Sequence, residues 1–178
     1  SEDYPNVGAA IDDGQVNIRI TSSFTETGFT AVPNNDISVY VDGVGVTWSY
    51  TASRQFTSSN YTRTFAIYLN GANINRTQAS AGFEHMFDFT GTTTAKVHFY
   101  GGGSFVNSGG TFDDNYWINK QVNQKFFENY RFELNNRKGQ GIECDGDFYA
   151  DSLEFFGGGS SCKDALVLTG TKPQKIGL

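Results

Sequence analysis

Hydrophobic and polar residues alternate over short runs of this chain, and turn-forming residues separate the runs. Alternation with a period of two is typical of a half-buried β-strand, because successive side chains of a strand point to opposite faces. Residues 37–41 and 44–50 show the pattern most clearly. The other runs that predict strands are 16–20, 65–69, 72–76, 85–89, 96–100, 130–134, 152–156 and 165–168.

The dipeptide Asp42-Gly43 lies between the two clearest runs. Asp-Gly supplies the two positive φ angles of a type I′ turn, so these runs predict an antiparallel hairpin. Pairing across a two-residue turn would bring six apolar residues onto one face, as a buried sheet face requires. The predicted pairs are Val41 with Val44, Val39 with Val46, and Ile37 with Trp48.

Asn70-Gly71 predicts a second hairpin in the same way. The returning run carries Asn73 and Asn75 on the face opposite its apolar residues, so we expect these two side chains to meet solvent. The predicted apolar pairs are Leu69 with Ala72 and Ile67 with Ile74.

Many short strands with frequent turn signals predict an all-β fold, an antiparallel β-sandwich of jelly-roll type. The whole chain, residues 1–178, is expected to form one domain, with a possible internal boundary at the Gly-rich residues 101–115. At most one short helix is expected, near residues 117–130, where apolar residues have a loose helical spacing. No internal repeat with a period of 20–50 residues is evident, which argues against a repeat architecture.

The composition supports the β prediction. The chain has 16 Phe and 9 Tyr but only six Leu, the first of them Leu69. Aromatic side chains suit a pleated sheet, whereas helices favour Leu and Ala. Most of the aromatic rings are therefore expected in a buried β core.

The formal net charge of −6 argues against a non-specific nucleic-acid partner, which would require a basic surface. No run approaches the roughly 20 apolar residues that span a bilayer, so no membrane insertion is expected. The expected partners are further copies or neighbouring subunits, and glycans are a second possibility. The apolar-poor segment 1–14 could add to a neighbouring subunit as a strand.

The covalent features suit an extracellular protein or one on a cell or virion surface. Cys144 and Cys162 could form a disulfide, although a reduced protein could carry the same two residues. Asn60 and Asn75 each begin an Asn-x-Thr sequence, the acceptor pattern for N-glycosylation.

Clustered Asp residues give a candidate calcium site at Asp145, Asp147 and Asp151. Ca²⁺ takes six to eight oxygen ligands, often from carboxylates on loops. The alternative is that these residues are turn formers at strand ends. Calcium is therefore a possible cofactor, and no other cofactor is expected.

A candidate glycan site combines Tyr116 and Trp117 with the carboxylates of Asp113 and Asp114. An exposed aromatic ring on a rigid sheet can stack on a sugar, and nearby carboxylates can accept its hydroxyl hydrogen bonds. The alternative for Trp117 is a place in the core.

Motifs of hydrolytic chemistry are missing from the sequence: it has no Gly-x-Ser-x-Gly elbow and no His-Glu-x-x-His pair. We therefore expect a non-enzymatic, extracellular structural or adhesive subunit of an appendage, adhesin or fibre head. The first alternative is a carbohydrate-binding module, with or without the assistance of calcium. The second is a hydrolase whose catalytic carboxylates the sequence does not single out.

Overall fold

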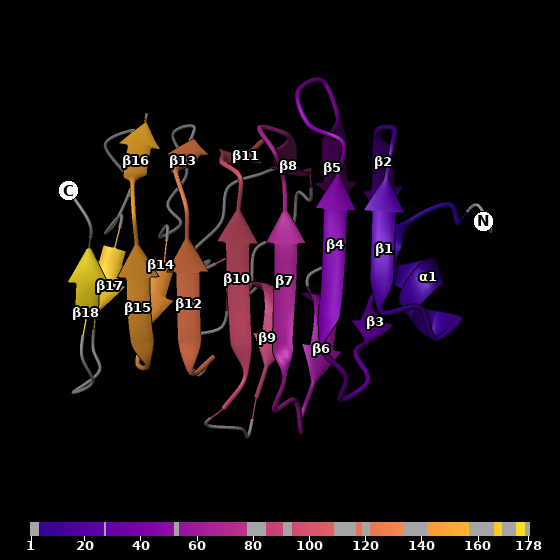
Figure 1. The fold of residues 1–178 in the computed structure, drawn as a ribbon, viewed down its shortest axis with the longest axis horizontal. Helices are drawn as coiled ribbons and strands as arrows, with labels where there is room; N and C mark the ends of the chain where they lie inside the picture. The colour runs from indigo at the N-terminus through magenta and orange to yellow at the C-terminus, as the bar shows by residue number, and fades with distance from the viewer. Residues whose placement is uncertain are drawn as a thin grey trace.

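Successive strands of the chain stack in parallel into a β-solenoid (Figure 1). The computed structural model describes ten segments of the chain, and every strand pairing among them is parallel. The described segments are residues 4–26, 28–51, 54–77, 85–90, 94–108, 117–118, 122–133, 142–156, 166–168 and 174–176.

The widest sheet, sheet A, has seven described strands that follow one another along the solenoid axis. In spatial order they are β1 (Asn17–Ile20), β4 (Ile37–Val41), β7 (Thr64–Tyr68), β10 (Lys96–Tyr100), β12 (Gln124–Phe127), β15 (Asp147–Ala150) and β18 (Gln174–Ile176).

Sheet B has six described strands and runs alongside sheet A. Its strands are β2 (Phe24–Glu26), β5 (Thr47–Tyr50), β8 (Asn73–Arg76), β11 (Gly103–Asn107), β13 (Tyr130–Glu133) and β16 (Leu153–Phe156).

Two smaller sheets complete the described strands. Sheet C contains β3 (Thr30–Ala31), β6 (Arg54–Ser58) and β9 (His85–Phe89), and sheet D contains β14 (Ile142–Cys144) and β17 (Leu166–Leu168).

The expected antiparallel sandwich is therefore wrong, although most of the strand positions were predicted. β4 and β5, the two arms of the first expected hairpin, lie in different sheets. Ile37 pairs with Phe65, which lies in the next turn of the solenoid, rather than with Trp48. We call each turn of the solenoid a coil. The second expected hairpin is wrong for the same reason, because β7 lies in sheet A and β8 in sheet B.

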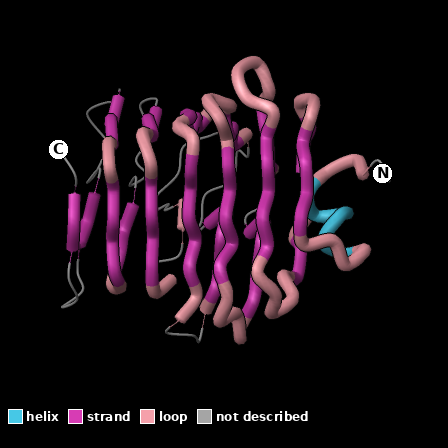
Figure 2. Tube along the Cα trace, in the orientation of Figure 1, coloured by secondary structure: helices cyan, strands magenta, loops and turns pink. Residues whose placement is uncertain are grey.

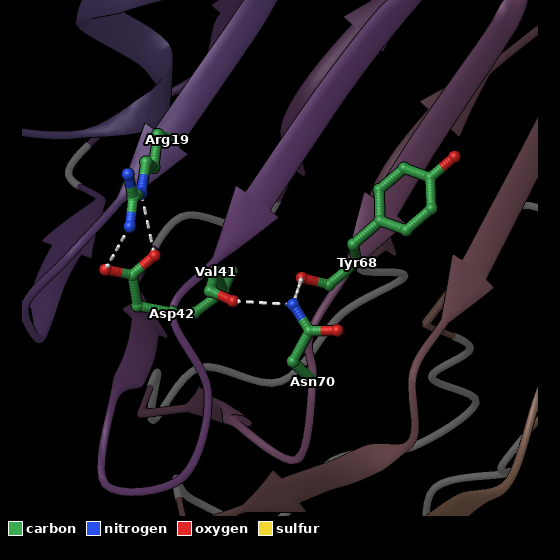
Figure 3. A network of polar contacts seen from close by, with 5 residues as sticks. All are labelled: Arg19, Val41, Asp42, Tyr68 and Asn70. Atoms are coloured by element: carbon green, nitrogen blue, oxygen red, sulfur yellow. Dashed lines mark hydrogen bonds and ion pairs between the residues drawn. The ribbon is translucent and has the colours of Figure 1, made fainter.

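The turn dipeptides form the corners at which the chain passes from sheet A to sheet B. Asn70 and Gly71 do have positive φ angles, 51° and 86°. The Asn70 side chain donates from Nδ2 to the carbonyl of Val41 at 2.9 Å and to that of Tyr68 at 3.4 Å (Figure 3). The Gly71 N–H donates to the carbonyl of Gly102 in the next corner at 2.9 Å. Hydrogen bonds therefore hold successive corners over one another.

The buried faces were predicted correctly even though the pairings were not. Successive side chains point to opposite faces in parallel and antiparallel strands alike, so the apolar side chains of each run still point inward. Of the ten residues in the predicted apolar pairs of the two hairpins, only Val44 is on the surface, 89% exposed, because it lies in a corner. Asn73 is exposed, as expected, and Asn75 is partly buried.

Stacked aromatic rings fill much of the core. Phe99 of β10 lies over Phe127 of β12, with ring centroids 5.3 Å apart and planes within 3°. Phe105 and Phe132 of sheet B stack in the same way, with centroids 4.6 Å apart. The surplus of Phe over Leu thus reflects inward positions that repeat from coil to coil.

The helix expected near residues 117–130 is wrong. Within that range the structure describes β12 and the start of β13. The chain turns a corner at Asn129, which has a positive φ of 57°. The alternation of apolar and polar residues in β12 therefore does not continue in step into β13, and the apolar residues of the two strands together have a spacing that resembles that of a helix. Among the described residues, no helix is long and apolar enough to cross a membrane.

A short helix that the sequence analysis missed, α1 (Val7–Asp12), covers the N-terminal end of the solenoid (Figure 2). Asn6 caps it by accepting a hydrogen bond from the Ala9 N–H at 2.8 Å. Val7 and Ala10 of the helix are fully buried. Residues 7–12 therefore form a cap rather than part of the strand expected to add to a neighbouring subunit.

Glu26 of β2 holds this cap in place. Its side chain is only 1% exposed and accepts the Gly8 N–H at 3.1 Å and 3.3 Å. Burial raises the pKa of Glu26 to about 7; the N–H groups of Gly8 and Val7 lower it, and the nearby charge of Asp12 raises it. The carboxyl group under the cap therefore titrates near neutral pH.

Glu26→Gln should remove a pH dependence of stability. Because folding raises the pKa of Glu26 from 4.5 to about 7, this group favours folding most below pH 4.5 and loses that contribution as the pH rises to 7. Above pH 7 the variant should be more stable than the parent by up to about 3 kcal/mol. Urea unfolding between pH 4.5 and 8 measures this, with the exposed Asp151→Asn as control. Parallel curves for Glu26→Gln and the parent would contradict it.

Val39→Asp should unfold the domain, whereas Asn73→Asp should change little. Val39 is fully buried in sheet A, and an unpaired buried carboxylate costs more than about 3 kcal/mol. Asn73 points to solvent from sheet B. Thermal unfolding of the two variants checks the sheet faces, and equal melting temperatures would show that the faces are assigned wrongly.

Candidate functional site

A row of tyrosine rings lies on the outer face of sheet A. The register places Tyr40, Tyr68 and Tyr100 at equivalent positions of β4, β7 and β10. The ring centroids of Tyr40 and Tyr68 are 4.7 Å apart with planes within 8°, and those of Tyr68 and Tyr100 are 4.8 Å apart with planes within 18°. These distances match the spacing of paired strands, about 4.8 Å. The stack therefore follows directly from the parallel register.

The rings cover one another's faces, so the row presents mainly ring edges to solvent. Tyr40, at the N-terminal end of the stack, is 43% exposed, and Tyr68 and Tyr100 are partly buried. Arg19 of β1 occupies the next position in the row. Its guanidinium makes two hydrogen bonds to Asp42, at 2.9 Å and 3.2 Å (Figure 3).

A second outward row widens the aromatic surface toward β12 and β15. His98, Phe126 and Tyr149 are in register, and all three are partly buried. The His98 ring meets Phe126 edge-on with centroids 5.8 Å apart, and Tyr100 lies 5.2 Å from Phe126. We call the outward residues of the two rows the aromatic face: Tyr40, Tyr68, Tyr100, His98, Phe126 and Tyr149.

His98 links the aromatic face to its hydrogen-bonding groups. The ring Nε2 lies 2.7 Å from Gln124 Oε1, and Nδ1 lies 3.0 Å from the Tyr100 hydroxyl. With the amide oxygen as acceptor, Nε2–H donates to Gln124, and Nδ1 accepts the Tyr100 hydroxyl proton. Both ring nitrogens of His98 therefore make hydrogen bonds within the protein.

The pKa shifts keep this group neutral at pH 7. Burial lowers the pKa of His98, and the Lys96 charge lowers it further, while the hydrogen bond to Gln124 raises it. Burial and the neighbouring Tyr68 and Glu128 raise the pKa of Tyr100. The centre of the aromatic face therefore offers uncharged polar groups beside its rings.

Of the predicted glycan site, only Trp117 falls within the described residues. Trp117 is 6% exposed and packs edge-on against Tyr50 and Phe105, with centroids 6.0 Å and 4.9 Å away. It is part of the core, which was the alternative for this residue. The other members of that predicted site, Asp113, Asp114 and Tyr116, lie outside the described residues.

The predicted calcium residues lie around β15, but not together. Asp145 and Asp147 lie at its start, whereas Asp151 follows its last residue, Ala150. Four residues of extended chain separate Asp147 from Asp151 by roughly 13 Å, too far for both to bind one ion. The described part of the chain contains no group of three or more His, Cys, Asp or Glu side chains that could hold a metal. Calcium binding by this chain stays a prediction.

The predicted covalent features also stay predictions. Cys144 is buried with a free thiol that lies 3.5 Å from the Gly146 carbonyl, and its expected partner Cys162 lies outside the described residues. Asn60 is exposed between β6 and β7, as a glycan acceptor requires. Asn75 is partly buried, and its Oδ1 accepts the Ser108 hydroxyl at 2.7 Å.

Sequence analysis missed the aromatic face because it assigned most rings to the core. A signal was nevertheless present. In the runs 37–41, 64–68 and 96–100, a Tyr stands out of phase with the buried apolar residues and close before a turn. Three Tyr residues at the same outward position mark a shared surface once the strands are known to stack in parallel.

Comparisons with known proteins assign no family: no family model, no curated protein and no solved structure matches the chain. Any function must therefore be argued from its own residues.

The His98 ring should titrate below its ordinary pKa of 6.5, because burial disfavours the imidazolium. Gln124→Ala should lower the midpoint further, since the lost hydrogen bond is one that raises the pKa. An NMR titration of the imidazole carbon-bound protons measures both values. A midpoint above 6.5 in the parent, or an upward shift in the variant, would contradict this description of the cluster.

Proposed function

We propose that this chain is a non-catalytic adhesive subunit at an extracellular, cell or virion surface, and that it binds through the aromatic face of sheet A. The observation that carries the proposal is the stacked row of Tyr40, Tyr68 and Tyr100 on the outside of the solenoid. Core packing does not require rings there, because the inward positions of the same strands already fill the core. Aromatic side chains are enriched where proteins bind partners.

Rigidity supports a binding role. Hydrogen-bonded strands hold the outward rings in register, and the rings of Tyr40, Tyr68 and Tyr100 pack against one another. A ligand therefore meets a preorganised surface and orders few side chains on binding, which lowers the entropy cost of association.

The size of the face favours a small or repeated ligand over a single large protein partner. From β4 to β15, strands about 4.8 Å apart and about 16 Å long give a face on the order of 400 Å². A stable protein pair buries about 800 Å² from each partner. One copy should therefore bind weakly, and adhesion should gain strength when several copies engage at once.

A neutral glycan is the ligand that the side chains suit best, which favours the carbohydrate-binding reading. The amide N–H groups of Gln124 and the hydroxyl oxygen of Tyr100 provide uncharged hydrogen-bonding groups among the rings, and His98 holds both side chains in place. Sugars present both apolar C–H groups and hydroxyls, and this surface offers a match for both. Because both nitrogens of His98 already make hydrogen bonds within the protein, its arrangement supports binding more than proton transfer.

Tyr68→Thr should abolish binding while leaving the fold intact. It removes the central ring of the row, and Thr suits an outward strand position. The measurement is binding to a glycan array and to immobilised cell-surface extracts, with the protein displayed in many copies. We expect signals for the parent to fall at least about tenfold in the variant, about 1.4 kcal/mol per binding site.

Asn73→Thr is the matched control, because it places the same residue at an exposed position of sheet B. It should bind as the parent does. Equal loss in both variants would point to another cause than the aromatic face, and unchanged binding by Tyr68→Thr would overturn the proposal.

A further inference from the structure

A hollow lies at the N-terminal end of the solenoid, beside the first strand of sheet A. Its volume is about 1020 Å³. It is lined by β1 and the residues that follow it, including Asn17, Arg19 and Thr21, and by Tyr4 and Asn6 of the N-terminal segment. Figure 1 shows β1 as the terminal strand of sheet A on this side.

The backbone of β1 points unpaired groups into this hollow. The carbonyls of Val16 and Ile20 accept hydrogen bonds from β4 and the residue after it, through the N–H groups of Ser38 and Asp42. In a parallel ladder the N–H and C=O of one residue point to the same side, and alternate residues point to opposite sides. The backbone groups of Asn17, Arg19 and Thr21 therefore face away from β4, toward the hollow.

Two core side chains that border the hollow are slightly less buried than those behind them. Ile18 and Ile20 line it and keep 6% and 8% of their surface exposed. Val39 and Ile67, the next residues in the row of Ile18, are fully buried. One more strand beside β1 would cover Ile18 and Ile20 as β4 covers them on the other side.

We propose that an extended segment of a partner polypeptide adds to β1 in this hollow as one further parallel strand of sheet A. Its alternate apolar side chains cover Ile18 and Ile20, and its backbone pairs with Asn17, Arg19 and Thr21. The sheet itself supports this occupant, because its seven described strands are already parallel and in register. This interaction is separate from glycan binding at the aromatic face and does not depend on it.

The residues that line the hollow favour a single extended segment over the folded edge of a second copy. The N-terminal residues Tyr4 and Asn6 also line the hollow, and α1, which follows them, contacts β1 and β3. A whole sheet edge, such as β18 of another molecule with its neighbouring strands, is wider than one strand and would have to fit beside this N-terminal segment as well. An unpaired strand is narrower than such an edge.

Hydrogen exchange tests the proposal directly. The probe is a synthetic peptide with the sequence of residues 36–42, which contains β4, the strand that pairs with β1 in parallel register. Without peptide, the amides of Asn17, Arg19 and Thr21 should exchange fast, while those of Ile18 and Ile20 should be protected. With peptide, exchange at the first three should slow at least about tenfold. A peptide with Asp in place of the Val at position 39 is the control and should have no effect.

Variants of β1 separate backbone pairing from side-chain effects. Arg19→Pro removes one N–H at the free edge, where proline is tolerated, and should weaken peptide binding about tenfold or more. Arg19→Ala keeps that N–H and should bind as the parent does. Thr21→Pro, which lies after the end of β1, serves in place of Arg19→Pro if the latter fails to fold.

Three results would overturn the proposal. The first is a peptide that leaves exchange at Asn17, Arg19 and Thr21 unchanged at millimolar concentration. The second is equal peptide affinity for Arg19→Pro and Arg19→Ala. The third is protection of the same amides by a neutral oligosaccharide, or by self-association of the protein alone, because either would assign the hollow to a different occupant.

Discussion

In-register stacking of parallel strands is the constraint on which the rest of this molecule depends. Each residue of sheet A lies about 4.8 Å from the equivalent residue of the next coil, so side chains of one kind gather in rows along the axis. Inward rows pack Phe99 over Phe127, and the outward row stacks Tyr68 between Tyr40 and Tyr100. The same strand register therefore builds both the core and the candidate binding face.

A stack of coils must also end, and its last strands have neighbours on one side only. At the N-terminal end, α1 covers part of the core and is held by the buried carboxylate of Glu26. The cap leaves the edge of β1 beside a hollow. Such an edge is a template for another strand, which is why the fold points to an interaction there as well as on its broad face.

The sequence predicted where most strands lie and which side chains point inward, because alternation is the same in any sheet. It did not predict which strands pair. Asp-Gly and Asn-Gly allow a hairpin or a corner, since both contain residues that adopt positive φ angles, as Gly43, Asn70 and Gly71 do in these corners. The repeat was hidden because the coils differ in length: Asn17 pairs with Ser38, Ile37 with Phe65 and Thr64 with Lys96, offsets of 21, 28 and 32 residues. The aromatic face was missed for the same reason, because its rings meet only after the coils are stacked.

The most direct test of this account is a comparison of two engineered disulfides by mass spectrometry of the linked peptides. Thr47→Cys with Asn73→Cys joins outward positions that pair in the parallel solenoid, at a spacing that suits a disulfide. Ser38→Cys with Thr47→Cys joins positions that would face each other only if residues 37–41 and 44–50 formed a hairpin. The account predicts that the first pair oxidises readily and the second does not. Efficient formation of the 38–47 bridge, with none between 47 and 73, would contradict the parallel solenoid and everything inferred from its faces.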